Sequence, residues 1–465
     1  MIPPSRERRV RRRRFAALAG VLVLLLAGGA YLYEHHREAN ISNPDVAFET
    51  TPVVPPKVVA PPRADRTFNW PIYGYTPART RFFPLQRRAR PPFLPRWAVR
   101  GNDLLEFSPV AGGGSIYILK NNGALYAVKR ATGYVLWKKK LGDLAASSPA
   151  YRNGTVFVTL LQGKGTTGGR VAAVSVQFAN ILWSRSLPSR SESSPLVVGD
   201  TLYYGSEDGT VYALRTKDGN ARWTAKVGGA VKGGLAYDRG KLFFGDYSGR
   251  MHAYDAATGR KLWSVGTSGK PFGLGSGGFY ATPSVAFGRV YAGNTDGNMY
   301  SFSERNGALA WRTGTGGYVY ASAPVADIAG LGPTVYVGSY DSHVYAFDAK
   351  SGKVRWKVGA EGKISGGLQL IGDLLFYSTL NRHTTALGAA TGRRVWSVPR
   401  GKFNPVISDG RFLFLNGSTS LFAYDLRHGI AYPGLANEKR IEARLTAKRR
   451  ARGRLEAAHK VRPGH

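Results

Sequence analysis

The chain has 465 residues, no cysteine and a formal net charge of +36 at pH 7, with 65 Lys and Arg against 29 Asp and Glu. The lack of cysteine excludes disulfides, thiolate nucleophiles and thiolate metal sites, so stability has to come from buried apolar side chains. The positive charge either keeps the protein soluble or attracts it to anionic polymers, lipid headgroups or an acidic partner.

The first predicted element is a membrane segment. Residues 1–14 contain seven Arg and one Glu, and residues 15–33, FAALAGVLVLLLAGGAYLY, carry no charge. Nineteen such residues form a helix of about 28 Å, which matches the hydrocarbon core of a bilayer. We expect a transmembrane signal-anchor, with the basic tail 1–14 in the cytoplasm and the remainder outside. A cleaved signal peptide is the alternative, because Gly28-Gly29-Ala30 suits a cleavage site.

The next stretch is a predicted linker. Residues 34–66 hold six prolines and show no regular apolar period. Such composition is typical of an extended spacer, which here would lift the following domain off the membrane.

A nine-residue phrase then recurs six times, and each copy places Trp four residues after Gly. The copies are KRATGYVLW to Trp137, RTKDGNARW to Trp223, DAATGRKLW to Trp263, SERNGALAW to Trp311, DAKSGKVRW to Trp356 and GAATGRRVW to Trp396. A seventh copy, SVQFANILW to Trp183, has Ala179 in place of Gly. Successive tryptophans from Trp137 lie 46, 40, 40, 48, 45 and 40 residues apart. This period is the length of one four-stranded propeller blade.

Each unit has the pattern of a β-hairpin. In TVYALRTKDGNARW, a β-branched and aromatic run is followed by a turn at Asp218-Gly219 and a second run that ends at Trp223. The glycine supplies a positive φ angle at no steric cost, and the polar residue before it can hydrogen-bond the turn. The run 211–214 is apolar on both faces, as expected for a strand between neighbouring sheets.

The pattern A-x-D-x-x-T-G-x-x-x-W resembles the tryptophan-docking repeat of pyrroloquinoline-quinone (PQQ) type β-propellers, over roughly residues 70–430. The resemblance implies that each outer-strand Trp packs against the small residue and the Gly of a neighbouring blade. The matching small residues are Ala127, Ala213, Ala253, Ala346 and Ala386, with Ser301 departing, and the glycines are Gly133, Gly219, Gly259, Gly307, Gly352 and Gly392.

We therefore predict an all-β fold: an eight-bladed propeller of four-stranded antiparallel blades over residues 67–433, followed by a basic tail, 434–465. The last unit, STSLFAYDLRHGIAYPG, has Pro433 where Trp is expected, whereas FLPRWAVRG supplies Trp97 without preceding inner strands. Insertion of residues 93–100 as the outer strand of the last blade would close the ring and remove exposed edges. A seven-bladed ring with Trp97 in a strap is the alternative. The predicted docking residues are Trp97, Trp137, Trp183, Trp223, Trp263, Trp311, Trp356 and Trp396.

The sequence predicts no catalytic, cofactor-binding or metal-binding residue. Quinoprotein dehydrogenases of this repeat type carry adjacent cysteines beside the quinone, a calcium-binding set and an aspartate base, and this chain has no cysteine. Its repeat acids, such as Asp208, Asp255 and Asp348, fall in hairpin turns, and His252 and His343 sit at repeat positions that vary between blades. PQQ is therefore not expected as a cofactor.

Candidate binding residues come from the positions that differ between blades. The inner strand of each blade is expected to begin near one rim of the central channel, and these starts read LEFSP, AASSP, SESSP, AVKGG, FYATP, YASAP, KISGG and KFNP. They offer Glu106, Glu192, Lys232, Tyr280, Tyr320, Lys363 and Asn404 as a polar and aromatic rim. The insert 266–280, GTSGKPFGLGSGGFY, is expected to overhang it.

Three function classes remain open at this point. The first is a non-catalytic anchored propeller that scaffolds an envelope protein, similar in fold to the lipoprotein propeller of the outer-membrane β-barrel assembly machine (BamB-like), although this chain lacks the cysteine that a lipoprotein needs. The others are a degenerate quinoprotein oxidoreductase and a sensor or adhesion module for anionic envelope polymers. Fold does not decide among them. We expect a monomer that binds no nucleic acid, because the predicted location is extracytoplasmic.

The arginine block before residues 15–33 predicts an N-in, C-out protein that stays in the cell membrane. Protease added to intact protoplasts is expected to digest the propeller, as followed by immunoblotting of the C-terminus. Protection of the C-terminus would contradict this topology.

Overall fold

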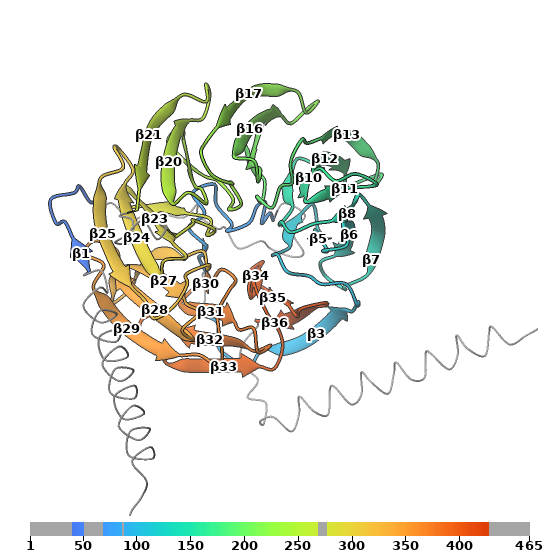
Figure 1. The fold of residues 1–465 in the computed structure, drawn as a ribbon. Helices are drawn as coiled ribbons and strands as arrows, with labels where there is room; N and C mark the ends of the chain where they lie inside the picture. Colours follow the sequence, from blue (N-terminus) through green and yellow to red (C-terminus); the bar gives the residue numbers. More distant parts are fainter. Residues whose placement is uncertain (1–39, 51–67, 86–87, 268–276, 427–465) are drawn as a thin grey trace, which may run out of the picture.

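The computed structural model describes residues 40–50, 68–85, 88–267 and 277–426. Eight antiparallel sheets are arranged around a central axis, so the predicted eight-bladed all-β propeller is confirmed (Figure 1). Within these ranges no helix has the length and apolarity to cross a bilayer. The predicted anchor, residues 15–33, and the basic tail, residues 434–465, lie outside the described residues.

The blades follow one another in chain order, and the strands of each run from the axis outward. Blade 1 contains β4 (Val110–Gly112), β5 (Ser115–Leu119), β6 (Ala124–Lys129) and β7 (Val135–Lys140). Blade 2 contains β9 (Ala150–Arg152), β10 (Thr155–Leu160), β12 (Arg170–Ser175) and β13 (Ile181–Ser186), with a small extra ladder between β8 (Gly142–Leu144) and β11 (Gln162–Gly163). Blade 3 contains β14 (Leu196–Val198), β15 (Thr201–Gly205), β16 (Thr210–Arg215) and β17 (Ala221–Lys226). Blade 4 contains β18 (Ala236–Asp238), β19 (Lys241–Gly245), β20 (Arg250–Asp255) and β21 (Lys261–Gly266).

The second half of the ring repeats this plan. Blade 5 contains β22 (Ser284–Ala286), β23 (Arg289–Gly293), β24 (Asn298–Ser303) and β25 (Leu309–Gly314). Blade 6 contains β26 (Val325–Ile328), β27 (Gly332–Gly338), β28 (His343–Asp348) and β29 (Val354–Gly359). Blade 7 contains β30 (Gln369–Ile371), β31 (Leu374–Ser378), β32 (Thr384–Gly388) and β33 (Arg394–Val398). Blade 8 contains β34 (Val406–Ser408), β35 (Phe412–Asn416), β36 (Leu421–Asp425) and, as its outer strand, β3 (Leu94–Val99).

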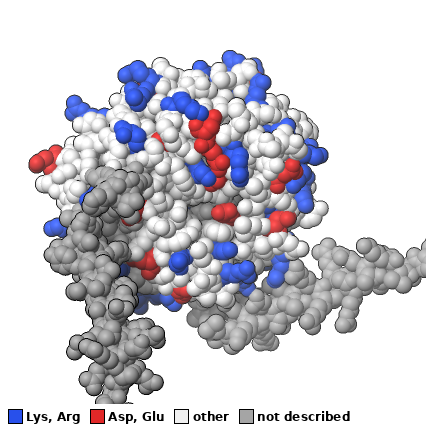
Figure 2. Space-filling model, viewed as in Figure 1, with Lys and Arg blue, Asp and Glu red and all other residues white. Residues whose placement is uncertain are grey.

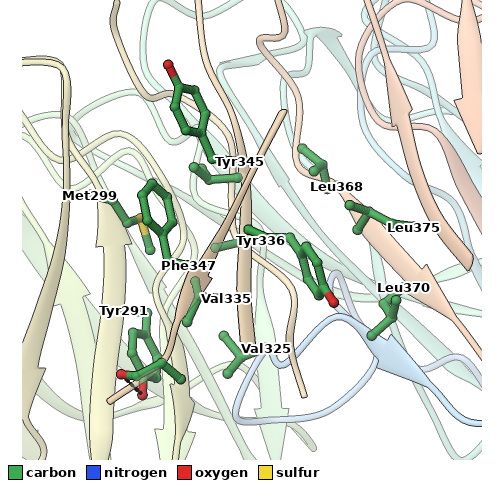
Figure 3. Packing of buried hydrophobic residues seen from close by; sticks show 14 of the residues in the cluster. Tyr291, Met299, Val325, Val335, Tyr336, Tyr345, Phe347, Leu368, Leu370 and Leu375 are labelled. Atoms are coloured by element: carbon green, nitrogen blue, oxygen red, sulfur yellow. Dashed lines mark hydrogen bonds between the residues drawn. The ribbon is translucent and has the colours of Figure 1, made fainter. Parts of the chain in front are cut away.

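The core lies between neighbouring sheets. Figure 3 shows one such layer, in which Tyr291 and Met299 of blade 5 and Leu370 and Leu375 of blade 7 flank buried residues of blade 6 such as Val335. Both faces of the middle strands are covered, which explains why these runs are continuously apolar rather than alternating.

The outer strands are held by tryptophan docking between blades. Six indole Nε1 atoms donate hydrogen bonds of 2.8–3.2 Å to backbone carbonyls in the hairpin of the following blade, for example Trp223 to Ala256 and Trp311 to Ala349. The hairpin glycine touches the ring: a Cβ atom added to Gly259 would lie 2.6 Å from Trp223. The small residue lies opposite the tryptophan within the same blade, as Ala213 does opposite Trp223. The expectation that this residue comes from a neighbouring blade is therefore corrected.

Ring closure through Trp97 is confirmed. β3 pairs antiparallel with β36, and Trp97 lies opposite Ala423, so the outer strand of the last blade comes from the N-terminal side of the propeller. Its indole ring packs on blade 1, because a Cβ atom at Gly133 would lie 2.6 Å from it. Arg96 adds a salt bridge of 2.7 Å to the buried carboxylate of Asp425. The seven-bladed alternative is thereby excluded.

The segment that precedes β3 closes one side of the central channel. Residues 70–83, which we call the belt, hydrogen-bond in succession to inner-strand backbone of blades 1, 2, 4, 5, 6 and 7, and the Arg79 side chain reaches carbonyls of blades 3 and 4. β2 (Phe82–Phe83), within the belt, pairs parallel with β30. Trp70, Ile72 and Phe83 are buried. The belt is thus part of the folded core.

Residues 40–50 of the predicted linker pack against blade 5, which corrects the expectation that the whole of 34–66 is a detached spacer. β1 (Ile41–Ser42) extends the edge of β25. Phe48 stacks on Phe287 with ring centroids 5.4 Å apart, and Arg289 donates hydrogen bonds to the carbonyls of Val46 and Ala47. The Phe48 ring and the Arg289 guanidinium attach this segment to blade 5. The proline-rich composition of residues 34–66 gave no indication of these contacts.

The hairpin position of Ala179 generates a stability prediction. Ala179 has φ +55°, the left-handed conformation that glycine adopts in the other copies, as Gly219 does with φ +70°. An L-residue pays about 1–2 kcal/mol there. Ala179→Gly is expected to raise the free energy of unfolding by about 0.5–1 kcal/mol, since part of the gain is offset by the flexibility of glycine in the unfolded chain. Urea unfolding monitored by tryptophan fluorescence provides the measurement.

The reverse change separates strain from crowding. Gly219→Ala adds a Cβ 2.5 Å from Trp183, whereas Gly199→Ala, at φ +59°, adds one in open space. We expect Gly219→Ala to be the more destabilising by about 1–3 kcal/mol, because its added methyl group would overlap the Trp183 ring and force the packing apart. Equal losses at the two positions would show that docking of Trp183 does not depend on the glycine.

Candidate functional site

The structure places a cavity of about 160 Å³ at the mouth of the central channel, lined by inner-strand starts of the blades and by Tyr73 of the belt. Its volume accommodates on the order of ten water molecules or a ligand of that size. Six of the seven predicted rim residues line it, namely Glu106, Glu192, Lys232, Tyr280, Tyr320 and Asn404. The seventh, Lys363, lies just outside, with its Nζ 5.6 Å from the ring centroid of Tyr340, a lining residue.

Lys232 is the centre of an ion-pair cluster at the cavity wall. Its Nζ lies 2.9 Å from a carboxylate oxygen of Glu192 and 2.9 Å from one of Glu207. Tyr280 donates a hydrogen bond of 3.1 Å to the other oxygen of Glu192. The charge of Lys232 is therefore neutralised within the protein. Arg190 also pairs with Glu207, at 3.8 Å, so the cluster holds two acids and two bases. Lys and Arg likewise lie beside Asp and Glu across the face of the molecule shown in Figure 2.

The two carboxyl groups titrate differently. Burial raises the pKa of Glu192, and a hydrogen bond shared with Glu207 raises it further. Burial would also raise the pKa of Glu207, but hydrogen bonds from Glu192 and Lys232 outweigh it and lower that pKa. On acidification the first proton therefore goes to Glu192.

Tyrosines form the other wall. The rings of Tyr280, Tyr320 and Tyr340 make successive edge contacts, with centroids 5.7 Å and 5.0 Å apart, and the half-exposed Tyr318 and Tyr247 extend the series on either side. Such rings offer large contact area at a low cost in side-chain entropy. The wall can therefore hold apolar or cationic groups of a partner.

Sequence reasoning missed the residues that come from turns and from the belt. Tyr247 and Tyr340 occupy the turns between the second and third strands of blades 4 and 6, in GDYSG and GSYDS. Tyr73 belongs to the belt and lines the cavity floor. A comparison of these turns between blades would have identified the first two, whereas only the path of the belt places Tyr73.

The belt also carries two buried arginines, Arg79 and Arg81, which do not line the cavity and have no carboxylate partner among the described residues. The guanidinium of Arg81 lies 4.0 Å from the Tyr73 ring centroid and donates to the Leu368 carbonyl, while its Nε and Nη2 have no acceptor among the described residues. Arg79 donates to backbone carbonyls that include those of Leu235 and Ser194. Burial lowers the pKa of both, and for Arg79 the charge of Arg81 adds to this effect.

The small hydroxyl residues at the inner-strand starts connect the blades. The amide of Ser148 donates to the Ser194 hydroxyl at 3.0 Å, and the amide of Gly234 donates to the Thr282 hydroxyl at 2.8 Å. The amide of Thr282 in turn donates to Ser322. These hydroxyls therefore fix the ring around the cavity.

The acids and histidines that were assigned to turns are bonded locally. Asp255 accepts hydrogen bonds from Thr258, and Asp348 accepts from Ser351. His252 Nε2 lies 3.0 Å from the buried Asp246. In the described ranges no three His, Asp or Glu side chains are grouped closely enough to hold a metal ion.

The cavity side chains do not fit PQQ with its calcium ion. Glu192 is bonded to Lys232 and Tyr280, and Glu106 accepts a hydrogen bond from Asn121. A calcium site requires several converging oxygen ligands. The carboxylates that line this cavity are instead directed to partners within the protein.

Removal of Lys232 provides a test of the ion-pair cluster. Lys232→Met leaves Glu192 and Glu207 facing each other, with side chains only 14% and 21% exposed. We expect a loss of about 1–3 kcal/mol in the free energy of unfolding near pH 8. The loss should shrink as the pH falls, because Glu192, whose pKa is already raised, takes up a proton and the repulsion disappears. Thermal unfolding at a series of pH values measures this.

Lys226→Met serves as the control, because Lys226 pairs with Asp208 at a far more exposed site. A pH-independent loss in Lys232→Met would contradict the assigned charge of the cluster.

Comparison with known proteins identifies relatives of this chain by sequence and by fold. The family described as "Outer membrane protein assembly factor BamB" matches residues 95–231 and 223–429, which is more than half of the chain. The chain is 26% identical over 171 residues to BamB of Moranella endobia, covering 33% of this chain and 42% of that protein. It is 32% identical over 111 residues to the quinohemoprotein alcohol dehydrogenase of Comamonas testosteroni, covering 21% and 16%. The match thus spans less than half the length of either relative.

Solved structures share the propeller. The crystal structure of BamB from Moraxella catarrhalis superposes with a TM-score of 0.58 at 18% identity, covering 72% of this chain and 99% of that one. The quinohemoprotein alcohol dehydrogenase ADHIIG from Pseudomonas putida HK5 gives 0.67 at 15% identity, covering 80% and 82%. Together with the tryptophan-docked eight-bladed ring, the family match shows that the chain belongs to the BamB family of PQQ-type β-propellers.

Proposed function

We propose that this protein is a membrane-anchored, extracytoplasmic binding module that scaffolds another protein of the bacterial cell envelope through the mouth of its central channel. The observation that carries the proposal is the cavity itself. It combines a tyrosine wall with a paired charge cluster on a rigid ring. Family membership supports the choice of an envelope protein as the partner.

The charge at the cavity mouth favours a protein over an anionic polymer. A polymer of one sign needs several free cations, but Lys232, one of the two predicted rim lysines, is bound by two carboxylates. Exposed aromatics such as Tyr318 beside fixed charges are typical of interface hot spots, where rings bury area and charge sets specificity. We therefore infer a folded or extended protein partner of mixed charge.

The anchoring part of the proposal comes from sequence. Residues 15–33 form the candidate membrane segment, and the arginine block before them gives the orientation N-in with the propeller outside. Six residues separate Tyr33 from Asn40, where the chain joins the edge of blade 5.

In-cell crosslinking tests the function. A photoreactive residue at Tyr318, at the cavity mouth, is expected to capture an envelope protein, whereas one at Lys217, on an exposed hairpin of blade 3, is not. Tyr318→Ala combined with Lys363→Ala should reduce capture at least severalfold, because hot-spot residues carry most of the binding energy. Mass spectrometry identifies the partner.

The matched control is Arg222→Ala combined with Lys261→Ala, which removes two exposed positions on outer strands. If the control pair reduced capture as much as the Tyr318 and Lys363 pair, diffuse contacts would be responsible and the cavity mouth would lose its proposed role.

A second candidate, a quinoprotein oxidoreductase, is favoured by the 32% identity to the Comamonas enzyme. We propose that PQQ is not a cofactor, because the carboxylates at the cavity do not converge on a calcium site. Purified protein incubated with PQQ and calcium is expected to bind no quinone at micromolar concentration and to oxidise no alcohol or sugar in a dye-linked assay. Stoichiometric quinone absorbance in the purified protein would establish the second candidate instead.

A further inference from the structure

We propose that the outer edge of blades 1 and 2 is a lipid-contacting surface that docks the propeller onto anionic headgroups. This surface, the apolar edge, consists of Tyr134, Val135, Leu136, Phe178, Ile181 and Leu182. It goes beyond the proposed scaffold function, which uses the cavity mouth, and does not depend on it.

The apolar edge collects most of the exposed large apolar side chains in the described residues. Tyr134 is 68% exposed and Phe178 is 73% exposed. Elsewhere in the described part of the chain, three other large apolar side chains are exposed: Tyr247 and Tyr318 at the cavity mouth and Val354 in blade 6. Contiguous exposed apolar groups on a soluble surface mark a site of interaction.

The two aromatic residues occupy fixed positions of the repeat at which the other regular copies have polar residues or, at Ala308, a small one. Tyr134 directly follows the hairpin glycine, and the equivalent residues of the other regular copies are Asn220, Arg260, Ala308, Lys353 and Arg393. Phe178 directly precedes the hairpin position of Ala179, and its equivalents are Thr132, Asp218, Thr258, Asn306, Ser351 and Thr391. The fold therefore does not require an aromatic at either tip, and the replacements need another explanation.

The two tips are neighbours on one face of the ring. They belong to equivalent hairpins of adjacent blades, which β7 and β13 complete at the outer edge (Figure 1). Trp137, at the end of the apolar run of blade 1, donates a hydrogen bond of 3.0 Å to the Val176 carbonyl in the hairpin of blade 2. This bond holds β7, which begins directly after Tyr134, against the hairpin that carries Phe178.

The charge around the edge is strongly positive. Between residues 129 and 185 the only carboxylate is Asp143. The exposed basic residues in the same stretch are Lys129, Lys138, Lys140, Arg152, Lys164 and Arg185. Lys140 pairs with Asp143, and Arg130 is buried in a salt bridge with Asp409 and does not contribute to the surface. Lys138 and Lys139 lie on the exposed outer strand itself, directly after Trp137. This is the charge complement of an anionic membrane surface, which attracts each nearby Lys or Arg.

The shape favours lipid over a protein partner. The aromatics stand at protruding hairpin tips, and a fluid interface adapts to separate tips, whereas a specific protein interface needs about 800 Å² of complementary surface on each partner. Aromatic side chains flanked by Lys and Arg are the combination that settles at the headgroup level.

The test uses the full chain in vesicles and exploits the absence of native cysteine, which allows a single fluorescent label. The label is attached through Asn180→Cys, at the tip of blade 2, or through Lys353→Cys, the equivalent position of blade 6. Vesicles contain phosphatidylglycerol and phosphatidylcholine with a nitroxide-headgroup quencher. We expect quenching at position 180 to exceed that at 353 severalfold, and to fall towards the value at 353 in phosphatidylcholine alone or at high salt.

Two variants then assign the contact to the apolar edge and its charge. Tyr134→Asn with Phe178→Thr substitutes the repeat's own residues, so folding should be unaffected, and it is expected to weaken quenching at position 180 by about tenfold in the apparent lipid affinity. Lys138→Ser with Lys139→Ser should act similarly through the lost charge. Tyr318→Asn, an exposed aromatic at the cavity mouth, should leave quenching unchanged.

Three results would overturn the proposal. Equal quenching at positions 180 and 353 would mean that only the tether brings the propeller to the membrane. Full quenching in the Tyr134 and Phe178 variant would exclude these side chains. Protection of the label at position 180 by a second copy or by another protein, without lipid, would assign the edge to a protein interface. Loss of partner capture at Tyr318 would leave all of these readouts unaffected, so the two proposals fail separately.

Discussion

The ring depends on one interaction repeated around it: an indole ring laid on a hairpin glycine of the next blade while its N–H binds a carbonyl three residues before that glycine. Trp311 shows it in full, with its Nε1 2.9 Å from the Ala349 carbonyl and its ring against Gly352, and it is completely buried. The interaction couples sheets that share no backbone ladder at their outer edges. It thereby holds the inner-strand starts in register around the cavity.

Most of the fold could be predicted from the repeat, because tryptophan docking requires particular residues at a fixed spacing in each blade. Gly and Trp four residues apart identify each hairpin, and the orphan Trp97 together with Pro433 predicted which segment completes blade 8. Ala179 shows the limit of such patterns, since the backbone keeps its left-handed turn without the glycine. The packing of the N-terminal elements could not be predicted in the same way. The stacking of Phe48 on Phe287 occurs once, so no repeated spacing in the sequence indicates it.

The candidate site was predictable as a list of residues but not as a charge pattern. Six of the seven rim residues meet at one cavity because equivalent positions of a closed ring converge on its axis. Sequence analysis predicted a polar and aromatic rim that contains both Glu192 and Lys232, without indicating which of its charges are paired. The structure pairs Lys232 with Glu192 and with Glu207, a residue that lies in a turn and was not considered. Pairing across blades is a tertiary property, so spacing along one blade does not contain it.

The path of the belt also determines when the protein can become complete during synthesis. Residues 70–83 leave the ribosome before any blade, yet their hydrogen-bond partners extend to Gly372 in blade 7. Arg96 of β3 likewise pairs with Asp425, 329 positions later. Contacts of such high sequence separation form slowly, and partly assembled chains expose strand edges meanwhile. The belt and β3 can therefore complete their contacts only after the last blade has been synthesised, so the ring closes as the final step of folding.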